Sequence, residues 1–166
     1  MKMHLGVMDI PYTEAPAMPK RVPKARPGRQ RKRAPKASAS PQPVTTGDVA
    51  GFLESKYQVI GHFVGAHEAE IVQAIDESLM GAIESRLMGS APNDPFAAAT
   101  SQIEGMFRSF LDNDEMASLG VAGVPTAAAL RGFNPRLTQP YARRAPRPSF
   151  IASGLYQKSF KAWVTD

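Results

Sequence analysis

The sequence predicts an α+β fold that is mainly helical, with long helices packed with a small C-terminal β element and preceded by an extended basic arm. Apolar residues recur at helical spacing through the middle of the chain, bulky residues alternate near its end, and prolines and cations crowd its first third. The chain has 166 residues, and its first third has too few apolar residues for a core. We therefore divide it into an arm, 1–46, and one helical domain, 47–166.

The arm begins with a short apolar segment and continues into a proline-rich stretch. In 1–12 apolar and polar residues are interleaved, which is typical of a strand that adds to another one. Between 14 and 43 the repeated prolines remove backbone donors and hold the chain extended. Almost no large apolar side chain is present there to offset the entropy of ordering. We therefore expect neither a helix nor a central strand in that stretch.

The positive charges of the arm lie in one stretch that contains no acid. We predict that these cations bind a partner: Arg21, Lys24, Arg26, Arg29, Arg31, Lys32, Arg33 and Lys36. Cations spaced by Pro, Gly and Ala can lie along an anionic protein groove or along a nucleic-acid backbone, where they release counterions. No aromatic residue that would stack on bases occurs between Pro19 and Pro43, so a nucleic-acid contact would be sequence-blind. The plain alternative is a solvated tail or an import-like run.

Helical spacing begins after Asp48, which is the predicted N-cap of the first helix. Apolar residues recur in 52–64 and then at every fourth position from Ile71 to Leu87. The pattern predicts two helices, or one long helix kinked near Gly61 and Gly65.

This helical region is expected to end at Gly89, because glycine commonly follows the last turn of a helix. A third helix is predicted over about 95–111, where apolar residues share one face. Pro125 suits the first position of a further turn or two, which Gly132 would stop.

The rest of the chain predicts an extended basic loop followed by a strand. The loop, 134–149, contains Arg143, Arg144 and Arg147, which we assign to subunit contacts or to the lining of a channel. After it, Phe160 and the alternate residues up to position 164 follow the spacing of a strand.

Charge divides the chain into three zones, since 48–115 is mostly acidic and lies between two basic stretches. The acidic helices of one copy could receive the basic arm or loop of the next, as a homo-oligomeric head-to-tail ring requires.

The sequence carries no motif of an enzyme. It has no cysteine, no Gly-x-Ser-x-Gly and no phosphate-binding glycine loop. His62 and His67 are five apart, which misses the spacing that places two ligands on one helix face. No apolar run has the length of a membrane span or of a secretory signal. We expect no catalysis, no metal, no cofactor and no membrane contact.

Residues 148–160, PSFIASGLYQKSF, resemble a segment of the tail-completion, or neck, proteins of tailed bacteriophages. That family shows a proline, then Thr-Gly, a hydrophobic residue two places on, and a Ser-Ile pair. Ser153-Gly154 stands for the Thr-Gly, Tyr156 for the hydrophobic residue, and Ser159-Phe160 for the Ser-Ile pair. Family members continue into further strands and lack a basic arm, so the sheet here should be small or completed by another subunit.

The resemblance implies a virion structural protein at the head–tail interface, assembled in the host cytoplasm. Such a head-tail connector subunit forms a ring between a portal or adaptor protein and the tail proteins. The alternative is an accessory protein that binds nucleic acid without sequence specificity through the basic arm.

Overall fold

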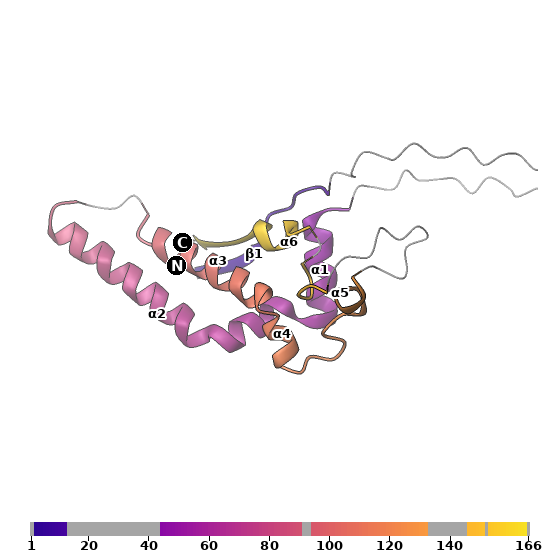
Figure 1. The fold of residues 1–166 in the computed structure, drawn as a ribbon. Helices are drawn as coiled ribbons and strands as arrows, with labels where there is room; N and C mark the ends of the chain where they lie inside the picture. Colours follow the sequence, from indigo (N-terminus) through magenta and orange to yellow (C-terminus); the bar gives the residue numbers. More distant parts are fainter. Residues whose placement is uncertain (1, 13–43, 91–93, 133–145, 152, 166) are drawn as a thin grey trace, which may run out of the picture.

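The computed structural model describes residues 2–12, 44–90, 94–132, 146–151 and 153–165. Six helices and two strands occur in these ranges (Figure 1): β1 (Lys2–Val7), α1 (Thr46–Tyr57), α2 (Val59–Leu87), α3 (Ala97–Asp112), α4 (Glu115–Ser118), α5 (Ala127–Arg131), α6 (Leu155–Ser159) and β2 (Phe160–Thr165). This confirms the predicted class, a mainly helical α+β fold with a small β element.

The small sheet joins two segments from opposite ends of the sequence. Strands β1 and β2 pair antiparallel, in a register that runs from Lys2 opposite Thr165 to Val7 opposite Phe160. Side chains alternate across the strands, and those of one face of β2 are buried at Phe160 and Ala162. The predicted strand at the C-terminal end is therefore confirmed.

Strand β1 belongs to the folded domain. Its apolar residues Met3, Leu5 and Val7 pack against the core. The division at residue 46 assigned them to the arm. The structure differs from that division because β1 pairs with β2, and this pairing places its apolar side chains against the core.

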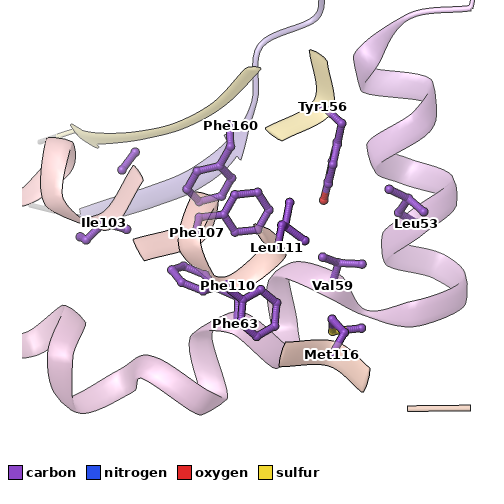
Figure 2. Packing of buried hydrophobic residues seen from close by; sticks show 11 residues of the cluster. Leu53, Val59, Phe63, Ile103, Phe107, Phe110, Leu111, Met116, Tyr156 and Phe160 are labelled. Carbon is purple, nitrogen blue, oxygen red and sulfur yellow. The ribbon is translucent and has the colours of Figure 1, made fainter. Parts of the chain in front are cut away.

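The core is an aromatic cluster around α3 (Figure 2). The rings of Phe107 and Phe160 stack with centroids 3.9 Å apart, and Phe63 of α2 meets Phe107 edge to face at 5.2 Å. All three side chains are at most 1% exposed. Helix α3 is thus clamped between α2 on one side and the sheet on the other.

The first helical region is broken at Gln58, which adopts a left-handed conformation with φ 49°. The Glu54 carboxylate reaches across this break and accepts hydrogen bonds from the backbone N–H groups of Ile60 (2.8 Å) and Gly61 (3.2 Å). It caps the first turn of α2. Of the two predicted alternatives, two helices or one long helix kinked near Gly61 and Gly65, the structure has two helices. The break precedes Gly61 because capping by Glu54 starts α2 before that residue.

Helix α2 contains a second irregularity at His67, whose φ of −115° and ψ of 19° are not helical. We call residues 59–66 the inner part of α2, and residues 68–87 together with the C-cap Met88 its outer part. The predicted kink near Gly65 is thus found two residues later. Packing explains the position, because the His67 ring lies against Phe63 and Phe110.

The structure corrects two predicted helix starts, those of α1 and α5. Thr45, rather than Asp48, is the N-cap of α1, and Asp48 completes a capping box with it. At α5, Thr126 is the N-cap and accepts from the Ala129 N–H at 3.2 Å. Pro125 precedes that cap, because the Thr126 hydroxyl satisfies the first turn.

The described residues on either side of 13–43 are held together. The Tyr12 N–H donates to the Val44 carbonyl at 2.9 Å, and a bridge pairs Pro11 with Thr45. Thr46, which is fully buried, accepts from the Ile10 N–H at 2.7 Å. The segment that carries the predicted basic cluster is therefore attached to the domain at both ends, instead of being a tail attached at one.

Candidate functional site

The motif 153–160 forms the entrance to β2. Gly154 has φ 74°, which an L side chain rarely adopts, and the Ser153 hydroxyl accepts from the Leu155 N–H at 3.3 Å. Tyr156 and Phe160 are 3% and 1% exposed, and the Ser159 hydroxyl donates to the Tyr156 carbonyl at 2.9 Å. These side chains position the helix–strand junction in the core.

The Tyr156 hydroxyl is buried without a hydrogen-bond partner among the described residues. Burial raises the pKa of the phenol well above its usual range, and the negative charge of Glu54 raises it further. Tyr156 is thus a buried side chain of α6 whose neutral form is favoured.

A groove of about 640 Å³ opens between α1, α5 and residues 147–151. Two hydrogen bonds join residues 147–151 to α5 and the residue before it: the Ser149 hydroxyl accepts from the Thr126 N–H at 3.2 Å, and the Arg147 N–H donates to the Ala129 carbonyl at 3.3 Å. Phe150 lies against Tyr57, with ring centroids 5.1 Å apart. The groove is therefore formed by three chain segments: α1, the segment that contains α5, and residues 147–151.

The lining of the groove combines apolar and cationic groups. Phe52 and Leu130 belong to it and are 57% and 56% exposed. Lys56 lies over the rings of Phe52 (5.7 Å) and Tyr57 (4.8 Å), and Arg147 is also in the lining. Such a surface fits an apolar segment that carries acidic residues.

A second exposed apolar surface covers the outer part of α2. Large apolar side chains there range from 41% to 85% exposed: Val72, Leu79, Met80, Ile83, Leu87 and Met88. Helix α3 covers the neighbouring face, where Ala74 is buried and the Ser78 hydroxyl donates to the Pro95 carbonyl at 2.8 Å. The apolar arc of α2 is therefore wider than the surface that the described residues cover.

The groove and the outer part of α2 lie at opposite ends of the molecule. In Figure 1, α1 and α5 are at the right, and α2 runs away from them to its far end at the left. The domain thus presents two different exposed apolar surfaces.

Of the predicted basic residues, the structure describes only Arg147. Arg21, Lys24, Arg26, Arg29, Arg31, Lys32, Arg33 and Lys36 lie outside the described residues, as do Arg143 and Arg144. Arg147 is described and lies in the groove. The groove itself could not be found from sequence, because its walls come from segments about 100 positions apart.

His67 joins α2 to α4 through two carboxylates. Its Nδ1 faces Glu70, and its Nε2 lies 3.0 Å from the Glu115 carboxylate. Partial burial lowers the pKa of His67, but the two carboxylates outweigh it, and the net pKa is raised above its usual value. His67, Glu70 and Glu115 therefore link α2 to α4 at the kink.

Within the described ranges, no group of three or more His, Cys, Asp or Glu side chains is placed to hold a metal ion. None of the described helices is long and apolar enough to cross a membrane. Comparisons with protein-family models, with curated proteins and with solved structures gave no match.

Proposed function

We propose that this chain is a virion structural protein of a tailed bacteriophage, a neck or tail-completion subunit in a ring between portal or adaptor and tail. It works by binding rather than by turnover. The carrying observation is the outer part of α2, where six large apolar side chains are 41–85% exposed. Contiguous exposed apolar surface of this kind marks a protein–protein contact.

The place in a virion rests on the resemblance of residues 148–160 to neck proteins. The resembling residues form the α6–β2 junction, with Tyr156 and Phe160 buried. Because these buried residues support the fold, the resemblance supports a fold shared with the neck proteins. The surfaces that bind partners would then lie elsewhere on the domain.

The basic segment 13–43 is proposed to bind neighbouring virion proteins. Because Tyr12 and Val44 are hydrogen-bonded, a short glycine linker can replace 13–43 without separating β1 from β2. Removing everything before residue 44 would instead delete β1.

The linker variant tests this proposal in particle assembly. It should fold with unchanged helical content, and shortening the loop should stabilise it by about 1–2 kcal/mol. Incorporation into particles should fall at least about tenfold. A matched control neutralises exposed cations of the domain, Lys2 and Lys158, and should incorporate normally. Normal incorporation of the linker variant would contradict the tether role.

The alternative is a nucleic-acid-binding accessory protein, favoured by the acid-free run of cations between Lys20 and Lys36. Binding to arbitrary duplex DNA should then weaken linearly with log salt, and the linker variant should lose it. Negligible binding of the full chain at physiological salt would remove this alternative.

A further inference from the structure

We infer that copies of this chain join head to tail, with the end of α2 from one copy seated in the α1–α5 groove of the next. This contact deepens the proposed function, because it identifies the surfaces that would form the ring. Neither surface alone would specify the partner. The sizes, charges and positions of the two surfaces together indicate that each binds the other in a second copy.

The apolar parts of the two surfaces complement each other. Leu87 and Met88 at the end of α2 are 83% and 85% exposed, the highest values among the large apolar side chains of the described residues. The groove has a volume of about 640 Å³, within the range of sites that enclose several apolar groups. Phe52 and Leu130 offer it apolar walls. Insertion would remove apolar surface of both copies from water.

The charges of the two surfaces are also opposite. The outer part of α2 carries five carboxylates and one cation, Arg86, which directly precedes Leu87; the carboxylates are those of Glu68, Glu70, Asp76, Glu77 and Glu84. The groove contains Lys56 and Arg147, and exposed Arg131 ends α5 beside it. Opposite potentials would orient the approach and select the register of the contact.

The same charges disfavour the simplest alternative, a symmetric pair of α2 ends. That contact would place two outer parts of α2 against each other, each with five carboxylates and one cation, and the repulsion costs energy. Docking in the groove brings these carboxylates to cations instead. Because the two surfaces differ and lie at opposite ends (Figure 1), each copy can bind two others, as a ring or an open chain requires.

Two single substitutions test the contact by mixing. Leu87→Glu blocks the α2 end, and Phe52→Glu blocks the groove; both side chains are exposed, at 83% and 57%, so the fold should survive. Leu119→Glu is the matched control, because Leu119 is 48% exposed and belongs to neither surface. Circular dichroism checks the fold, and sedimentation velocity over a concentration series measures assembly.

The wild type and Leu119→Glu should form concentration-dependent oligomers. Each blocked variant alone should associate at least about tenfold more weakly. An equimolar mixture should form dimers and nothing larger, because only the α2 end of Phe52→Glu and the groove of Leu87→Glu remain intact. Dimers in the mixture alone are the signature of a head-to-tail contact.

Other outcomes overturn the inference. Dimers of Phe52→Glu alone would indicate an α2-to-α2 contact, and oligomers unaffected by either variant would place the contact elsewhere. A wild type that is monomeric at all concentrations, with assembly only after 13–43 is replaced by a linker, would mean that this segment occupies the groove of its own chain. A monomer with or without 13–43 would remove the contact altogether.

Particle assembly separates this contact from the proposed function. Head-to-tail oligomers in solution, with no incorporation of the wild type into particles, would retain the contact and remove the virion role. Normal incorporation of both blocked variants would retain the virion role and remove the contact.

Discussion

The two parts of α2 share the apolar spacing of a helix and have different surroundings. In the inner part, Val59 and Phe63 are fully buried against α3 and its aromatic cluster. In the outer part, Leu79 and Ile83 continue the apolar spacing but are 41% and 47% exposed. The difference shows that one kinked helix can supply both a part of the core and an exposed apolar surface. What separates them is how much of the helix surface is covered, because α3 and the residues before it cover only one face of the outer part, at Ala74 and Ser78.

The largest expected effect contrasts two apolar residues of this helix. Phe63→Ala should lower the free energy of unfolding by about 3–5 kcal/mol, because it removes a ring that packs against Phe107, Phe110 and Phe160. Ile83→Ala should cost less than about 1 kcal/mol, since the side chain is already half in water. Urea unfolding at low protein concentration measures both. Equal losses would break the comparison and show that the outer part is buried.

A smaller effect contrasts two carboxylates. Glu104 of α3 is 12% exposed and accepts from Lys161 Nζ at 3.0 Å and Arg108 Nη2 at 3.1 Å. Glu104→Gln should cost about 1–2 kcal/mol, because it weakens the charged contact that fixes β2 to α3. Part of that cost should disappear in high salt, since both cations are about 40% exposed.

Glu84→Gln on the outer part of α2 is the control for Glu104→Gln. Glu84 is exposed, so its substitution should change the free energy of unfolding by no more than about 0.5 kcal/mol. A loss as large as that of Glu104→Gln would show that the outer carboxylate has a partner in solution.

The smallest effect concerns His67, at the junction of the two parts. Its folded pKa is raised above its value in the unfolded chain, so protonation favours the folded state. This stabilisation is complete below a pH of about 6.5, the usual pKa of histidine, and is lost as the pH rises through the raised folded pKa.

Urea unfolding at pH 6 and pH 8.5 checks this contribution. The wild type should exceed His67→Gln in stability by more at pH 6 than at pH 8.5. His62→Gln is the matched control and should keep the pH dependence of the wild type. A stability difference between wild type and His67→Gln that is independent of pH would contradict the role assigned to Glu70 and Glu115.

Much of the secondary structure could be predicted because its causes are local. Apolar spacing located α3 and the helical region before it, and alternation from Phe160 located β2. Gly132 ends α5 with φ 70°, as its lack of a side chain permits. Predictions failed where a neighbour in sequence supplied an unexpected bond, as Glu54 does at the break at Gln58.

The sites were harder to predict because they depend on distant residues. Residues 1–12 have the pattern of a strand that adds to another one, but no local sequence pattern identifies β2 as its partner. The groove needs α1, α5 and residues 147–151 together, and its contacts are not encoded by any spacing. A wide apolar arc on α2, with Val72 and Met80 beside the main stripe, was the one available signal of an exposed surface.

The sequence by itself determined the mainly helical class, the acidic and basic zones and the segments able to become strands, because spacing and charge are properties of neighbouring residues. Only the tertiary structure decided that β1 closes on β2, that the basic segment is anchored at both ends, and which apolar residues stay exposed. Burial depends on what lies opposite a side chain. For Phe63 that is an aromatic cluster, and for Leu87 it is open surface.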